Sequence, residues 1–151
     1  MAVARSVVLV RKVEDKGGTM SNRPQPVEYH AASPEVRAVF DEIKAHRKIS
    51  NVTNFWKYLA SDPALLKRTW ATQKAVLTPG TLDTVVKEMI YLAVSITNGC
   101  EYGIASHTTL ARKAAMTDGM FAELVAVVGM ANQTNRFADA FRLPVDPEFD
   151  V

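Results

Sequence analysis

From Ser33 onward, the apolar residues of this 151-residue chain recur at the spacing of α-helices. Two segments place a capping side chain before a proline at the first helical position, Ser33-Pro34 and Asp62-Pro63. After residue 13, no segment alternates apolar and polar residues as a half-buried strand does. The sequence therefore predicts an all-α fold of about six helices, with no internal repeat.

The positions of caps, glycines and prolines give the expected helix boundaries. We expect helices from residue 34, over 54–59, from 63 to the Pro79-Gly80 turn, over about 82–97, over about 100–116, after Thr117, and around 137–141. The segment 82–97 is apolar on most sides, which is typical of a central helix. The chain then divides into an arm (1–32), one helical domain (33–143) and a tail (144–151).

The arm begins with a segment that the helical pattern does not explain. Residues 1–19 contain a short apolar run at 7–10 and a Gly17-Gly18 pair, and this run is too short for the core of a signal peptide. Three interpretations remain open: a short strand, a disordered arm, or an upstream extension of a protein whose translation starts at Met20.

Composition excludes several classes of protein. The single cysteine, Cys100, cannot form an intramolecular disulfide, so the chain is no secreted disulfide scaffold and a cytoplasmic location is expected. No apolar run is long enough to span a bilayer. The net charge is only +2 and the basic residues are scattered, so nucleic acid is not an expected partner.

Metal and cofactor sites are not expected either. The three histidines, His30, His46 and His107, lie far apart without the spacing of metal ligands. No glycine-rich loop that could cradle a phosphate is present.

The residues that could carry chemistry lie between positions 88 and 107. Cys100, Gly103 and His107 share one face of the expected helix 100–116, and Cys100 lies at its N-terminus, where the helix dipole favours a thiolate. Glu88 lies in the preceding apolar helix, where a carboxylate is costly unless it has a partner. Glu88 and His107 are therefore candidates for an acid/base pair.

Structural interpretations of the same residues remain open. His107 is also compatible with a buried core histidine that has a hydrogen-bond partner, and Cys100 with a small hydrophobic residue. In the same way, Glu88 is compatible with a side chain that reaches solvent past Lys87. The aromatic residues Trp56, Trp70 and the 55–58 cluster fit either a hydrophobic core or a subunit interface.

The segment 98–108, with Glu88 upstream, resembles the motif of the carboxymuconolactone decarboxylase/AhpD-like family. In the AhpD-type peroxidases, a glutamate and eleven residues precede Cys-X-His-Cys, and a histidine follows after three more residues. Glu88, Cys100 and His107 match this motif in identity and spacing. The resemblance implies an all-α domain over about 33–143 and assembly into a homotrimer or homohexamer.

Two positions depart from the peroxidase motif. Tyr102 stands where the peroxidases often have histidine, and Gly103 stands in place of the second cysteine, which attacks the peroxide in the family. Without a second thiol, the internal disulfide of the peroxidase cycle cannot form. Positions 100 and 107 are also separated by about 10 Å along a helix axis, too far for direct proton transfer between their side chains.

Three functions are compatible with these residues. The first is a cofactor-free enzyme, decarboxylase-like or lyase-like, that acts on a small organic acid or lactone. In it His107 would be the acid/base, Glu88 its orienting carboxylate, Tyr102 a hydrogen-bond donor, and Gly103 a space for the substrate. The second is a one-cysteine alkylhydroperoxidase of peroxiredoxin type that uses Cys100. The third is a non-catalytic oligomer that binds a small molecule.

Overall fold

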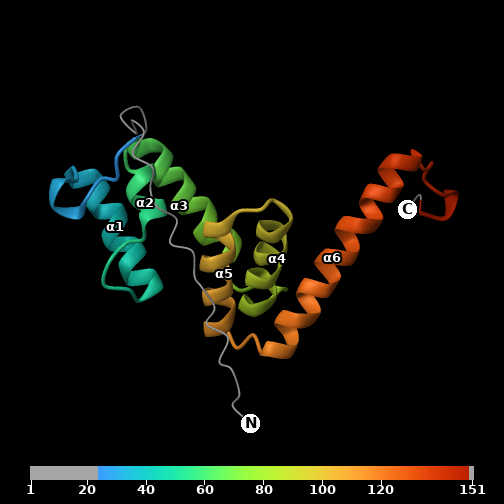
Figure 1. Cartoon of the computed structure of the whole chain (residues 1–151). Helices are drawn as coiled ribbons and strands as arrows, with labels where there is room; N and C mark the ends of the chain where they lie inside the picture. Colours follow the sequence, from blue (N-terminus) through green and yellow to red (C-terminus); the bar gives the residue numbers. More distant parts are fainter. Residues whose placement is uncertain (1–23, 150–151) are drawn as a thin grey trace, which may run out of the picture. The chain divides into compact units, whose positions relative to one another are not determined.

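The computed structural model describes residues 24–149, which form six α-helices and two short 3-10 helices and contain no strand (Figure 1). The elements are η1 (Tyr29–Ala31), α1 (Pro34–Arg47), α2 (Asn54–Leu59), α3 (Pro63–Leu77), α4 (Thr84–Thr97), α5 (Glu101–Lys113), α6 (Asp118–Phe141) and η2 (Pro147–Phe149). This confirms the expected all-α fold. The apolar run and the two alternative start positions within residues 1–20 lie outside the described residues.

Short polar side chains begin most of these helices. Ser33 accepts a hydrogen bond from the Val36 backbone N–H at the start of α1, with a distance of 3.3 Å. Asp83 and Thr117 cap α4 and α6 in the same way. Such caps satisfy backbone N–H groups that have no partner within the helix, which is why the helices begin at these residues.

Three of the expected boundaries were wrong. A separate last helix around 137–141 does not exist, because α6 continues without a break from Asp118 to Phe141. Helix α4 begins at Thr84 rather than near 82, since Asp83 is its cap. Helix α5 ends at Lys113 rather than near 116, and Ala115 follows with a φ of 77°, a left-handed conformation that ends a helix.

The described chain divides into two compact units, one ending at Arg68 and the other beginning at Thr69. In the first unit, the buried apolar side chains come from α1, α2 and the first turns of α3. Its fully buried side chains are Phe40, Ile43, Trp56 and Leu66. Of the two expected roles for Trp56, the structure therefore supports the hydrophobic core.

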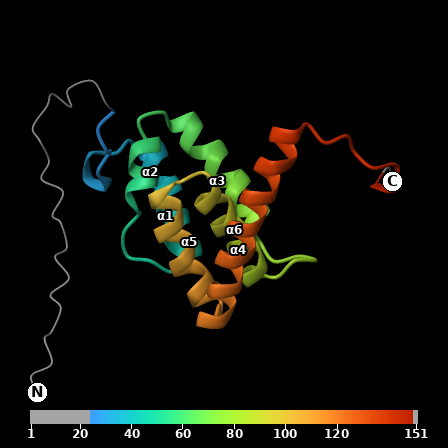
Figure 2. The ribbon, with the colours of Figure 1, turned by 45° about the vertical axis from the view of Figure 1, so that its right-hand side comes forward.

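The second unit is built on a hairpin of two helices. Helix α4 packs mainly against α5, and also against α6 (Figures 1 and 2). The buried residues of this core are Leu92, Ala111, Met116, Leu124 and Val128. The turn between α4 and α5 contains Gly99, whose φ of 64° favours glycine. Residues 88 and 107 lie on the two arms of this hairpin.

Helix α6 leaves much apolar surface uncovered in the single chain. Its buried residues, Leu124 and Val128, lie in its first half. Phe137 and Phe141 in its second half are exposed, and this half extends beyond α4 and α5 (Figure 1). Over the part of the chain that the structure describes, no helix combines the length and the apolar character that crossing a membrane requires.

Candidate functional site

Glu88 and His107 form a buried hydrogen-bonded pair between α4 and α5. The Oε2 atom of Glu88 lies 2.6 Å from Nδ1 of His107. The two residues are only 6% and 5% exposed. The carboxylate therefore has the partner that its burial requires, and the interpretation in which Glu88 reaches solvent past Lys87 is wrong.

The pairing also determines how the imidazole is presented. A carboxylate accepts the proton of Nδ1–H, so the Nε2 atom is the one available for further chemistry. Within residues 24–149, no side chain or backbone group forms a hydrogen bond with Nε2. This arrangement suits a histidine that takes a proton from a bound molecule or gives one to it.

Tyr91 is a contact of His107 that was not expected from the sequence. Its ring stacks on the imidazole, with ring centroids 3.6 Å apart and an interplanar angle of 17°. Tyr91 lies one turn after Glu88 on α4, and this spacing is the sequence signal that could have indicated it. The carboxylate of Glu88 and the Tyr91 ring thus fix the imidazole from its edge and from one face.

Cys100 occupies the opposite end of the hairpin. It is the N-cap of α5, as expected, and its Sγ accepts a hydrogen bond from the Gly103 backbone N–H at 3.3 Å. The thiol is free and exposed. His107 follows Cys100 by seven positions, about 10 Å along the helix, so the structure pairs Glu88 with His107 and leaves Cys100 apart from them.

Gly103 does not leave a space, contrary to the expectation from the sequence. A Cβ atom at this position would lie 2.6 Å from Ser95 Oγ and 3.0 Å from Ser95 Cβ. The Ser95 hydroxyl also donates to the Tyr91 carbonyl oxygen at 2.9 Å, which holds its side chain in place. Gly103 is therefore a point of close approach between α5 and α4 rather than an opening for a ligand.

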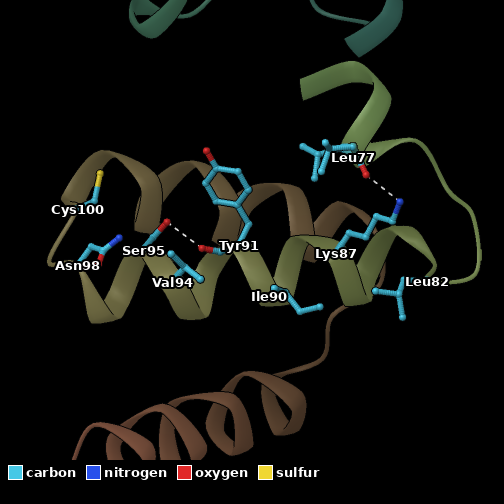
Figure 3. A pocket seen from close by; sticks show the side chains of 10 residues that line it. Leu77, Leu82, Lys87, Ile90, Tyr91, Val94, Ser95, Asn98 and Cys100 are labelled. Carbon is cyan, nitrogen blue, oxygen red and sulfur yellow. Dashed lines mark hydrogen bonds between the residues drawn. The ribbon is translucent and has the colours of Figure 1, made fainter. Parts of the chain in front are cut away.

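A groove of about 610 Å³ runs along α4 (Figure 3). Apolar side chains from the end of α3, the following loop and α4 form most of its wall: Val76, Leu77, Leu82, Ile90 and Val94. At the other end, the lining is polar and consists of Ser95, Asn98 and Cys100. Tyr91 lies between the two ends, whereas Tyr102, expected to bind substrate, is exposed on α5 and is not part of this lining.

Lys87 also borders the groove, but its ammonium group is engaged by the backbone. The Nζ atom donates to the carbonyl oxygens of Val76 and Thr78 at 2.8 and 2.6 Å. Val76 belongs to the last turn of α3, where carbonyl groups lack helical partners. Lys87 thus links the start of α4 to the end of α3 and the loop that follows it. Its charge is not directed into the groove.

Glu88 also borders a second cavity of about 480 Å³, on the side of the hairpin formed by the start of α4 and the end of α5. Asp83, Thr84 and Lys113 give this cavity a more polar lining than that of the groove. Across the described residues, no group of three His, Cys, Asp or Glu side chains is arranged to hold a metal ion.

Comparisons with known proteins show the family and the fold of this chain. The family model of the carboxymuconolactone decarboxylase family matches residues 63–146. The crystal structure of the alkylhydroperoxidase AhpD core from Rhodospirillum rubrum is 46% identical in sequence, with a TM-score of 0.81. That similarity covers 88% of this chain and 99% of the other chain. A search of curated proteins gave no match.

Proposed function

Because this chain belongs to the carboxymuconolactone decarboxylase family, we propose that it is a cofactor-free enzyme that moves a proton on a small organic molecule. One observation carries the proposal: the buried contact of 2.6 Å between Glu88 and His107. Two buried polar side chains in a hydrogen-bonded pair beside a groove are a common arrangement of acid/base sites.

In the proposed reaction, Nε2 of His107 takes a proton from the substrate and returns one to the product. Glu88 accepts the Nδ1–H bond throughout, which fixes the tautomer and stabilises the imidazolium while it carries the extra proton. Small organic acids and lactones are the proposed substrates, in line with a decarboxylase-like or lyase-like reaction. A decarboxylation of this kind would break a carbon–carbon bond to CO₂ and place the histidine proton on the remaining carbanion.

A screen of small acids and lactones with matched variants tests this function. His107→Ala should lower kcat by about 10²- to 10⁴-fold on any substrate that the wild type turns over. Glu88→Gln should lower it less, because the imidazole remains but loses its orienting carboxylate. His46→Ala is the control, since His46 is an exposed residue of α1 and should leave kcat unchanged. Unchanged turnover in His107→Ala would contradict the proposal.

A second candidate function is a one-cysteine hydroperoxidase. It is supported by the exposed Cys100 thiol at the N-terminus of α5 and by the 46% identity to the AhpD core. The Cys100 thiolate would attack the outer oxygen of a hydroperoxide, giving a sulfenic acid and, after protonation, an alcohol. Two equivalents of an external thiol would then restore the cysteine, releasing water and a disulfide.

Peroxide-dependent trapping of a sulfenic acid on Cys100, measured by intact mass, tests this alternative. Rapid stoichiometric trapping, faster than for a free thiol, would support the hydroperoxidase. Slow trapping, together with full activity in Cys100→Ser, would exclude it. If no substrate class is turned over by wild type, the non-catalytic binding function becomes the better explanation.

We also propose that the protein assembles into a homotrimer or homohexamer. Support comes from the exposed apolar residues of α6, among them Val127, Met130, Phe137 and Phe141. A chain that keeps them exposed would be poorly soluble, whereas packing between copies would bury them. Native mass spectrometry should therefore show three or six copies, and a Phe137→Lys variant should show fewer. The proposed location is the cytoplasm, where Cys100 would stay reduced.

A further inference from the structure

Tyr91 belongs both to the groove and to the buried pair. It lines the groove, and the same ring stacks on His107 at a centroid distance of 3.6 Å. His107 itself is 5% exposed and is not part of the groove wall, whereas Tyr91 is 41% exposed. A molecule in the groove therefore meets Tyr91 before it meets the imidazole.

The groove has the size and chemical pattern of a small-molecule site. Its volume of about 610 Å³ lies within the range of pockets that enclose small organic ligands. Apolar side chains line one end, and Ser95, Asn98 and Cys100 line the other (Figure 3). From Lys87 to Asn98, the groove follows α4 over about 16 Å. No charged group is directed into it, since the Lys87 ammonium binds two backbone carbonyl groups.

We propose that the groove binds an organic molecule with an apolar body and one small uncharged polar group, and that Tyr91 is the positioning residue between this molecule and His107. The proposal rests on the acid/base function proposed above and narrows its substrate class: of the small acids and lactones named there, it selects the lactones and other uncharged molecules, because no charged lining residue could pair with a carboxylate. The apolar body would lie against Leu77, Ile90 and Val94, and the polar group would lie toward Ser95 and Asn98.

Tyr91 is suited to this role by both parts of its side chain. The ring keeps the imidazole in one plane, which complements the hydrogen bond that Glu88 makes in that plane. Within residues 24–149, the phenolic hydroxyl of Tyr91 makes no hydrogen bond, so it can donate to a molecule in the groove. Figure 3 shows this hydroxyl pointing away from the α4 backbone.

Carbethoxylation of histidines by diethylpyrocarbonate, followed by peptide mass spectrometry, tests the position of Tyr91 without requiring turnover. The full chain contains three histidines, and the exposed His30 and His46 serve as internal standards. In wild type, His107 should react more slowly than both. Tyr91→Ala should raise the rate at His107 about three- to tenfold, the range that loss of an aromatic stack allows. Tyr91→Phe keeps the ring and should stay within about twofold of wild type.

Ile90→Ala is the matched control for the loss of a groove side chain. Ile90 lines the groove next to Tyr91 in the sequence, and no stacking contact joins it to His107. This variant should leave the His107 rate unchanged, and helical circular dichroism should be the same in all variants. Equal rates in Tyr91→Ala and wild type, or a rise in Tyr91→Phe as large as in Tyr91→Ala, would overturn the role of the ring.

The fluorescent probe 2-naphthol, an apolar ring system with one hydroxyl, tests the substrate class. It should bind wild type and slow carbethoxylation of His107. Val94→Lys places a charge in the groove and should weaken 2-naphthol binding at least about tenfold. Val145→Lys is the control, because Val145 is an exposed valine outside the groove and its replacement should not change binding.

Two results would overturn the groove assignment. One is 2-naphthol binding that is equal in Val94→Lys and Val145→Lys. The other is a smaller oligomer in Val94→Lys, measured by native mass spectrometry, because a second copy of the chain would then occupy the groove. Both readouts are independent of the acid/base function, which fails separately if His107→Ala retains full turnover.

Discussion

Gly103 of α5 lies in direct contact with Ser95 of α4, so closely that a Cβ atom at position 103 would be 2.6 Å from Ser95 Oγ. The contact lies at the end of the groove, and it brings together the two helices that carry Glu88 and His107. Ser95 cannot swing aside freely, because its hydroxyl bonds the Tyr91 carbonyl oxygen. A side chain at 103 therefore forces the helices apart or breaks this bond.

Gly103→Ala should lower the free energy of unfolding by about 1–3 kcal/mol, the usual cost of overpacking. Gly129→Ala is the matched control, because Gly129 lies within α6 and a Cβ there would meet no atom within 4 Å. That variant should raise the free energy of unfolding by about 0.5–1 kcal/mol, since alanine is the better helix former. Urea unfolding of the two variants measures both changes in the free energy of unfolding. A Gly103→Ala protein as stable as wild type would contradict the packing.

Ser95→Ala should recover part of the loss caused by Gly103→Ala. Ser95→Ala removes Oγ, the atom nearest to the added Cβ of residue 103, but leaves the Cβ of residue 95 at 3.0 Å from it. The recovery of stability should therefore be incomplete. In a double-mutant cycle, the coupling energy between positions 95 and 103 should therefore be favourable and about 0.5–3 kcal/mol. Additive effects would mean that the cost of Gly103→Ala arises elsewhere.

Glu88 and His107 should be coupled in stability as well as in activity. Glu88→Ala removes the hydrogen-bond acceptor and leaves a buried imidazole N–H without its partner, at a cost of about 1–3 kcal/mol. In the double variant Glu88→Ala/His107→Ala, the loss should be smaller than the sum of the two single losses, because no unpaired group remains. Urea unfolding of the wild type, the two single variants and the double variant measures this coupling. Glu123→Ala is the control: because Glu123 is exposed, its effect on the free energy of unfolding should be additive with that of His107→Ala.

The starts of several helices were predictable from the sequence, because a helix start is determined by residues that are close together in the chain. Ser33 and Thr117 were identified as caps, since a helix start depends on a few neighbouring residues. The continuity of α6 was missed because Gly129 and the polar residues after it weaken the apolar pattern, while the helix still propagates through them.

The candidate site was predictable only where burial requires a partner. A carboxylate in the apolar α4 must be paired, and the family motif placed His107 within reach, so the Glu88–His107 pair followed. Tyr91 and Ser95 were missed because their contacts depend on the rotation and separation of α4 and α5. A shift of one helical position would rotate either side chain by about 100° around the helix and away from α5.

Asp41 carries a pH-dependent contribution to the first unit. The hydrogen bond from Lys44 to Asp41, 2.7 Å between Nζ and Oδ1, lowers the pKa of the carboxyl, and the hydroxyl of Tyr29 adds to this effect. A lowered pKa in the folded state stabilises the fold above the pKa of the unfolded chain, and this stabilisation is lost as the pH falls through the folded value. The pKa of Lys44 is raised by the same bond, so its contribution is lost only in the alkaline range.

NMR titration of the Asp41 carboxyl should therefore give a pKa below the ordinary value, and Lys44→Ala should move it back upward. Tyr29→Phe should move it upward by less, since Tyr29 is the smaller influence. Because the group is exposed, added salt should shrink both shifts. A carboxyl pKa that does not respond to Lys44→Ala would show that this ion pair does not persist in solution.

Cys100 has a structural role as the cap of α5, and this role can be separated from its reactivity. Its Sγ accepts the Gly103 N–H bond, an interaction that a serine hydroxyl makes more strongly than a thiol. Cys100→Ser should therefore keep the free energy of unfolding or raise it slightly, whereas Cys100→Ala should lower it by about 0.5–1 kcal/mol. Thr117→Ala, which removes the corresponding cap of α6, sets the scale of the effect in the same protein.

Urea unfolding of these three variants decides whether Cys100→Ser is a valid probe of peroxide chemistry. If Cys100→Ser and Cys100→Ala are equally destabilised, the thiol does not cap α5 through this bond. If only Cys100→Ala is destabilised, then any loss of peroxidase activity in Cys100→Ser reports the chemistry of the thiol and not the stability of the helix. Retention of full activity in a stable Cys100→Ser protein would then leave Glu88 and His107 as the groups that carry the reaction.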